Sequence, residues 1–130
     1  MSEFIATVSG TVVTDVTSRT TSTGQLVASF RMAVNPRRFD RTTNAWVDQE
    51  SSYFQVSCWR QTAENVALSV AKGDPMLVTG KVRVRQWEDG GKSGTSVELE
   101  AVAIGHDLTR GSATFARNRR PAEPPIEMAA

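Results

Sequence analysis

A single segment of this chain, residues 62–72, has the apolar spacing of a helix, and strand-like alternation surrounds it on both sides. Its apolar residues recur at i, i+3, i+4 and i+7, which places them on one helical face: Ala63, Val66, Ala67 and Val70. Thr62 is expected to cap the helix, and Gly73 is expected just beyond its end. A chain with one helix must bury that apolar face against a sheet, which limits the folds open to it.

Five strands are predicted from alternating apolar and polar residues, three before the helix and two after it. They cover Phe4 to about Thr17, Gln25–Val34, Ser52–Trp59, Met76–Trp87 and Thr95 to about Ile104. Gly10 predicts a bend inside the first strand. Residues 18–24 and 88–94 are predicted hairpin loops. Residues 37–50 form a long polar excursion, and a hairpin tip is expected near residues 42–44.

This element order is that of the OB-fold, an all-β, five-stranded Greek-key barrel whose helix lies between strands three and four. Residues 1–111 are therefore predicted to form one OB-fold domain. From Gly111 the pattern fades into a proline-containing basic segment, and residues 112–130 are predicted to be a flexible tail. OB-fold barrels bind oligonucleotides across strands two and three and the loops beside them.

Composition excludes several classes of function. No apolar run approaches the roughly 18–20 residues that span a bilayer, and the N-terminus lacks a signal-peptide pattern, so a cytoplasmic location is expected. Cys58 is the only cysteine and is expected to be a buried, inert thiol. His106 is the only histidine, and the acidic residues are dispersed. No catalytic residue, metal site or cofactor is predicted, and the chain is not expected to be an enzyme.

The run Lys81–Trp87 alternates cations with valines and ends on a tryptophan. Because successive strand side chains point to opposite faces, Val82 and Val84 are expected to face a core. The other face then carries a cationic row that ends in an indole: Lys81, Arg83, Arg85 and Trp87. This face suits single-stranded nucleic acid, whose phosphates attract cations and whose bases stack on aromatic rings.

A second basic cluster lies on and after the second predicted strand. Its members are Arg31, Arg37, Arg38 and Arg41. In the loop after that strand only Asp40 opposes them, so phosphate contact is favoured here more strongly than at Arg83 and Arg85. The formal net charge of +1 does not by itself indicate a nucleic-acid partner, but a nearly neutral protein can still have a basic groove.

Over about residues 3–110, the chain resembles the bacterial single-stranded DNA-binding (SSB) proteins. The resemblance rests on runs that occur in order: 30–34 (FRMAV), 53–59 (YFQVSCW), 62–67 (TAENVA), 72–74 (KGD), 78–82 (VTGKV) and 85–89 (RQWED). Together these runs are specific, whereas any one alone is weak. The resemblance implies single-stranded DNA as the partner, roles in replication, recombination or repair, a nucleoid-associated location and a homotetramer.

The base-stacking positions of that family fall on Phe39, Tyr53, Trp59 and Trp87. At Phe39 and Tyr53 the best-known members have tryptophan, so the stacking area is smaller here. Typical members also end in an acidic tip that closes on proline-phenylalanine and recruits other enzymes. The last residues of this sequence lack that pattern. Recruitment through such a tip is therefore not expected, and the chain resembles a short paralogue.

Several candidate residues also have a purely structural interpretation. Trp59 lies where the third strand meets the helix and is about equally compatible with packing under it. Trp46 fits either an exposed loop ring or a subunit contact. If the last hairpin pairs position i with 183−i, then Arg85 faces Glu98 and Arg83 faces Glu100, and carboxylates compete with phosphates for these cations.

Two other functional hypotheses stay open at this point. One is an RNA-binding OB protein, because stacking alone does not distinguish the two sugars. The other is a structural or protein-interaction module in which Glu98 and Glu100 neutralise the basic face.

Overall fold

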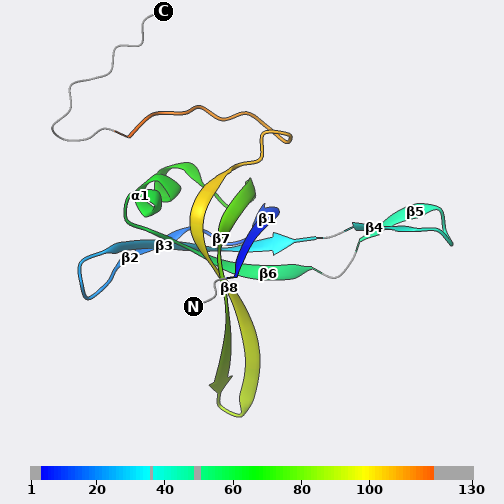
Figure 1. Cartoon of the computed structure of the whole chain (residues 1–130), viewed down its shortest axis with the longest axis horizontal. Helices are drawn as coiled ribbons and strands as arrows, with labels where there is room; N and C mark the ends of the chain where they lie inside the picture. Colours follow the sequence, from blue (N-terminus) through cyan, green and yellow to red (C-terminus); the bar gives the residue numbers. More distant parts are fainter. Residues whose placement is uncertain (1–3, 36, 49–50, 119–130) are drawn as a thin grey trace, which may run out of the picture.

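The computed structural model describes residues 4–35, 37–48 and 51–118. This part of the chain contains eight strands and one helix, and the helix lies to one side of the strands (Figure 1). The strands are β1 (Ile5–Val12), β2 (Thr17–Thr20), β3 (Leu26–Val34), β4 (Arg37–Asp40), β5 (Ala45–Asp48), β6 (Ser52–Trp59), β7 (Pro75–Asp89) and β8 (Lys92–His106), and the helix is α1 (Arg60–Ser69). The prediction of an all-β chain with one helix is confirmed.

The main sheet closes on itself through β1. Its strand order is β1-β7-β8-β6-β3-β2, and β1 also pairs with β3. Residues 5–11 of β1 pair with β7, and residues 11–12 pair with β3. Gly10 lies at this change of partner, where a Cβ atom would collide with the carbonyl oxygen of Ala33. A glycine is therefore required here because two backbones approach closely.

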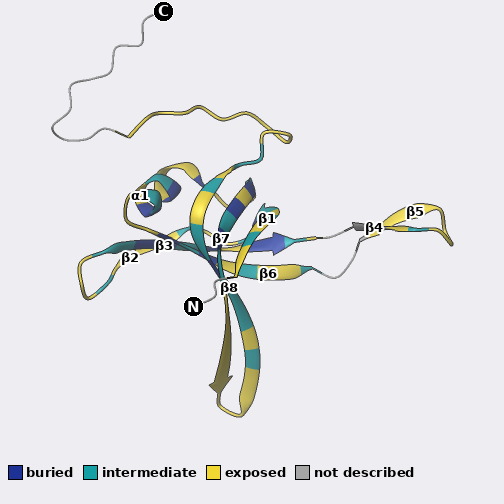
Figure 2. Cartoon of the chain, viewed as in Figure 1, coloured by how far each residue is buried: buried dark blue, intermediate teal, exposed yellow. Residues whose placement is uncertain are grey.

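The hydrophobic core fills the ring and continues under α1 (Figure 2). Alternate residues of β3 point into it, because a strand presents every second side chain to one face. The largest fully buried side chains are Phe30, Met32, Met76, Leu99, Val12, Val27, Val56, Val78 and Cys58. The helix adds Ala63 and Val66 to this core. This packing fixes the strands whose outer faces form the groove described below.

The helix differs from its prediction at both ends. It begins at Arg60, two residues before the expected start, and Trp59 is its N-cap without a side-chain hydrogen bond. It ends at Ser69, so Gly73 lies in the following turn and not directly after the helix. Val70 is buried as expected, but Ala67 is exposed, so the stripe is narrower than the periodicity indicates.

Part of the predicted loop at residues 18–24 belongs to strand β2. Residues 17–20 pair with residues 29–26 of β3, and the turn is confined to residues 21–25. Serine and threonine are compatible with strands as well as loops, so composition alone marked the wrong boundary. The shift matters because β2 brings Arg19 to the outer face of the sheet.

Two projections leave the barrel (Figure 1). The first is the β4–β5 hairpin, residues 37–48, which we call the arm; its turn at residues 41–44 confirms the expected tip. The second is the outer half of the β7–β8 hairpin, residues 84–97, which we call the ribbon. Val84 was expected to face a core, but it is 65% exposed because the ribbon has already left the barrel. Val82 does pack against the core.

After β8 the described chain has no regular secondary structure, and residues 108–118 are exposed. The side-chain amide of Asn65 on α1 donates a hydrogen bond to Asn118 at 3.0 Å. Residues 119–130 lie outside the described part. They include most of the predicted tail, so the structure does not test the expectation that this tail lacks an enzyme-recruiting tip. No helix among the described residues is long and apolar enough to cross a membrane.

Candidate nucleic-acid interface

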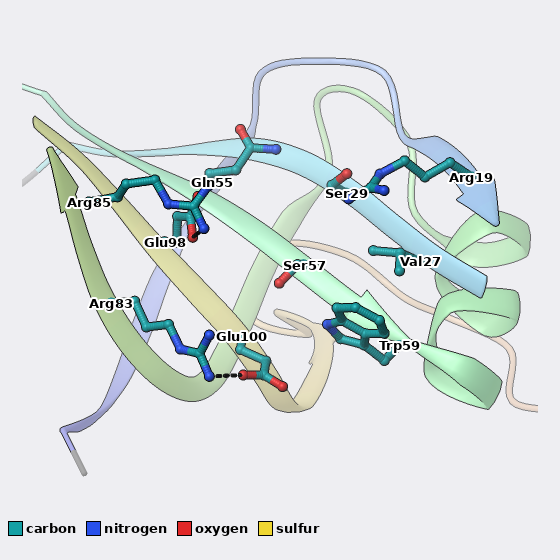
Figure 3. A pocket seen from close by; sticks show the side chains of 10 residues that line it. All are labelled: Arg19, Val27, Ser29, Gln55, Ser57, Trp59, Arg83, Arg85, Glu98 and Glu100. Atoms are coloured by element: carbon teal, nitrogen blue, oxygen red, sulfur yellow. Dashed lines mark ion pairs between the residues drawn. The ribbon is translucent and has the colours of Figure 1, made fainter. Parts of the chain in front are cut away.

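A groove of about 420 Å³ crosses the outer face of the sheet from β2 to β7 (Figure 3). Strand register explains its composition, because directly paired residues lie side by side on one face. Ser29 pairs with Ser57, and Ser57 pairs in turn with Glu100. The lining residues are Arg19, Val27, Ser29, Gln55, Ser57, Trp59, Arg83, Arg85, Glu98 and Glu100. The groove is therefore a wide, polar surface with an indole at one end.

Tyr53 and Trp59 lie on the same face of β6, since their positions differ by six, an even number. Tyr53 is 48% exposed and Trp59 is 36% exposed. The guanidinium carbon of Arg31 lies 4.6 Å from the centre of the Tyr53 ring, within cation–π range. The structure therefore brings three of the predicted residues together at the groove or along its edge.

The position of Trp59 favours ligand contact over packing under the helix. Its ring lines the groove next to Val27, its partner in β3 (Figure 3). Val27 is buried at this end of the groove, so the indole has an apolar support on one side and solvent on the other. A base stacking here would cover apolar surface that is otherwise exposed to water.

Two ion pairs join the arginines of β7 to carboxylates in the groove. Nη2 of Arg83 lies 3.4 Å from Oε2 of Glu100, and Nη2 of Arg85 lies 3.6 Å from Oε2 of Glu98. The Arg83–Glu100 pair is dashed in Figure 3. These are the expected partners, but the expected register is wrong: positions from Gly80 to Asp89 pair as 181−i, and both ion pairs run diagonally between strands.

The arginines remain the more accessible members of these pairs. The Arg83 and Arg85 side chains are 68% and 67% exposed, against 36% and 29% for Glu100 and Glu98. Exposed ion pairs contribute only about 0–1 kcal/mol, so a phosphate can displace the carboxylates at small cost. Lys81 lies on the same strand face and pairs in register with Glu100.

Trp87 lies on the ribbon, away from the core, and is 44% exposed. Its indole lies over the backbone of Gly94, its cross-strand partner. A Cβ atom built on Gly94 would be 2.5 Å from Cζ2 of Trp87, so the ring fits only because this residue has no side chain. The ribbon thus presents an indole supported on one side and open to a ligand on the other.

The remaining predicted residues belong to the arm and lie outside the groove. Phe39 on β4 and Trp46 on β5 form an edge-to-face pair. Arg41 is exposed in the turn. Arg37 and Arg38 lie on β4, where only their backbone is described. The structure therefore divides the predicted site between groove, ribbon and arm.

Sequence reasoning missed Arg19, Gln55 and the two serines of the groove. The sequence pattern places Arg19 in a loop, but the pairing of β2 with β3 brings it to the groove face. Gln55 and Ser57 share the face of β6 that carries Tyr53 and Trp59, so the period-two pattern that identified the face of Lys81–Trp87 would have found them if it had been applied to β6.

The remaining reactive side chains have structural roles. Cys58 is buried in the core, as predicted, and burial raises the pKa of its thiol to about 11, in keeping with the expected low reactivity. Nε2 of His106 lies 3.1 Å from Oδ2 of Asp74, and that oxygen also accepts the amide hydrogen of Ala71. Within the described residues, no three histidine, cysteine or acidic side chains lie close enough together to hold a metal ion.

The chain is similar in sequence to several known proteins. A model of the single-strand binding protein family matches residues 5–107. "Single-stranded DNA-binding protein 1" of Streptomyces coelicolor is 43% identical over 120 residues, which cover 92% of this chain and 76% of that protein. "Single-stranded DNA-binding protein 2" of Tropheryma whipplei is 40% identical over 111 residues, which cover 85% of this chain and 73% of that protein.

Solved structures show the same likeness in three dimensions. The small single-stranded DNA-binding protein of Streptomyces coelicolor superposes with a TM-score of 0.78 at 41% identity, covering 85% of this chain and all of that one. The second single-stranded DNA-binding protein of Mycobacterium smegmatis gives a TM-score of 0.70 at 30% identity, covering 88% and 99% of the two chains.

Proposed function

Because this chain belongs to the single-strand binding protein family, we propose that it binds and protects single-stranded DNA without regard to sequence. The observation that carries this proposal is the groove, where arginines and an aromatic ring share one face of a closed sheet. Family members act by binding, and the chain is accordingly a binding protein and not an enzyme.

The proposed binding mechanism combines base stacking with phosphate contacts. Trp59, Trp87, Tyr53 and Phe39 stack on bases through their ring faces, which contributes roughly 1–3 kcal/mol per base. The cations follow the phosphates: Arg19, Arg31, Arg37, Arg38, Arg41, Lys81, Arg83 and Arg85. Every base has a π face and every nucleotide a phosphate, so this mechanism needs no hydrogen bonds to base edges. Sequence preference is expected to be weak.

Quenching of tryptophan fluorescence tests the proposal directly. The protein is titrated with oligothymidylate, oligouridylate and a duplex of equal length. Strong quenching by oligothymidylate alone supports the proposed function, and equal quenching by oligouridylate favours an RNA-binding protein. If no strand quenches, the protein is better described as a structural module whose arginines are neutralised by Glu98 and Glu100.

The proposal extends to assembly, domain limits and location. A homotetramer is supported by the family and by apolar side chains on the outer face of β1 and β7, where Ile5 is 57% and Leu77 is 43% exposed. Mass measurement in solution tests it. We propose residues 1–111 as the binding domain and residues 112–130 as a tail outside it. A DNA-bound protein of this kind resides at the nucleoid in the cytoplasm.

A further inference from the structure

The arm carries a pair of aromatic rings that does not belong to the hydrophobic core. Phe39 and Trp46 are direct cross-strand partners, with ring centres 5.5 Å apart and planes at 63°. They are 42% and 63% exposed. Among the described residues the arm contacts no other strand or helix, so neither ring fills a space in the barrel. Large exposed rings of this kind commonly mark a binding surface.

We propose that Trp46 is a further stacking site for single-stranded DNA, held in place by Phe39. This inference rests on the proposed function, which already includes Phe39 and the arginines of the arm, and adds the indole of Trp46 as a stacking site beyond the groove. The ligand is a base of a strand that leaves the groove and continues along the arm.

The geometry of the pair leaves ring surface for a base. In an edge-to-face pair the edge of one ring meets a face of the other, so each ring keeps at least one face uncovered by its partner. Trp46 is the more exposed of the two and has the larger ring system. Phe39 restricts the Trp46 indole before any ligand arrives, which lowers the entropy that binding must remove.

The position and charge of the arm suit a strand that comes from the groove. The arm continues from the ends of β3 and β6, the strands that carry Arg31 and Tyr53 (Figure 1). Residues 37–48 contain three arginines and two acidic residues. One of those acids, Asp40, accepts the amide hydrogen of Thr42 at 2.9 Å, and this bond lowers its pKa. Its carboxylate is therefore engaged within the turn.

A purely structural interpretation is that the two rings only hold the arm together. Two variants separate it from the proposal. Trp46→Thr keeps a residue suited to strands but removes the ring. Val47→Thr is the matched control, because Val47 is the next residue on β5, points to the opposite face and is 39% exposed.

Binding is measured with fluorescein-labelled oligothymidylates of increasing length. Trp46→Thr is expected to weaken binding by about 5- to 150-fold for oligomers long enough to reach the arm, which corresponds to one stacked base. Oligomers confined to the groove should bind both variants and the parent protein alike. Equal affinity of Trp46→Thr and the parent protein at every length would overturn the proposal.

Photo-crosslinking provides a second readout that needs no substitution. The unaltered protein is irradiated with an oligomer that contains 5-bromodeoxyuridine, and the crosslinked residues are identified by mass spectrometry. A crosslink at Trp46 supports the arm site, whereas crosslinks at Trp59 or Trp87 alone refute it and leave the proposed function intact. If the unaltered protein binds no single strand at all, the proposed function fails first.

Discussion

The ion pairs in the groove lead to a prediction that runs against simple expectation: removing a groove carboxylate should strengthen DNA binding. The change is Glu100→Gln, which keeps the size and hydrogen-bonding capacity of the side chain but removes its charge. In the parent protein Glu100 holds Arg83 with an N–O distance of 3.4 Å. A phosphate that binds Arg83 must replace this contact, and it then lies beside a like charge.

The magnitude follows from the geometry and the exposure of the pair. An ion pair whose side chains are 68% and 36% exposed is worth about 0–1 kcal/mol after solvent screening. A phosphate on Arg83 would lie roughly 7 Å from the carboxylate, and their repulsion in water at 0.1 M salt is about 0.3 kcal/mol. The sum of about 0.3–1.3 kcal/mol predicts a two- to nine-fold gain in affinity.

Fluorescence titration with a short oligothymidylate at several salt concentrations measures this effect. If Arg83 gains one phosphate contact, the slope of log K against log salt should steepen by about 0.7. Glu64→Gln is the control, since it makes the same change in net charge on an exposed position of α1, outside the groove. Unchanged or weaker binding of Glu100→Gln, or an equal gain for Glu64→Gln, would refute the reasoning.

Three further predictions concern other parts of the structure. Gly94→Val should displace the indole of Trp87 and weaken binding by about 1–3 kcal/mol, with little change in melting temperature because the ribbon lies outside the core; binding equal to that of the parent protein would contradict this. Native Cys58, whose pKa is raised to about 11 by burial, should react with iodoacetamide at pH 8 at least about 100-fold more slowly than in denaturant, and comparable rates would show an accessible thiol. The pKa of Asp74 is lowered from 3.8, first by a backbone hydrogen bond and then by His106, so its contribution to stability is present above about pH 4 and is lost as the pH falls through the lower folded pKa. Asp74→Asn should therefore flatten the acid side of a plot of melting temperature against pH, and an unchanged acid side would exclude this origin.

The barrel strands could be predicted because their side chains alternate between core and solvent. Along β3 the apolar residues at even positions are buried or packed against the core, as the pattern indicates. The helix was found for the same reason, since Ala63, Val66 and Val70 are all buried. Its ends were misplaced because no side-chain cap marks its start.

The register of the last hairpin could not be predicted because its glycines have different roles. Gly90 and Gly91 both have positive φ angles and form the two-residue turn between β7 and β8. Gly94 resembles a turn residue in sequence, but it lies within β8 beneath Trp87. Counting it with the loop extended the predicted loop to residues 88–94, whereas the observed turn is only two residues long, and paired positions from Gly80 to Asp89 sum to 181 and not to the expected 183.

The candidate site was only partly predictable, because residue type can be read from the sequence but strand pairing between distant segments cannot. Residue type identified the aromatic rings and the arginines, because stacking and charge neutralisation require those groups. Which of them act together depends on strand partners that are distant in sequence. Gln55 lies beside Glu98 only because β6 and β8 run parallel, and this pairing has no local signature.

The closure of the barrel has a consequence for when the protein can act during its synthesis. Ile5 pairs with Lys81, so the ring joins segments far apart along the chain, and such contacts form slowly. The groove takes residues from Arg19 to Glu100. The complete groove can therefore form only after Glu100 has left the ribosome, when nearly the whole barrel has been synthesised. The arm, by contrast, pairs only within residues 37–48 and does not depend on this closure.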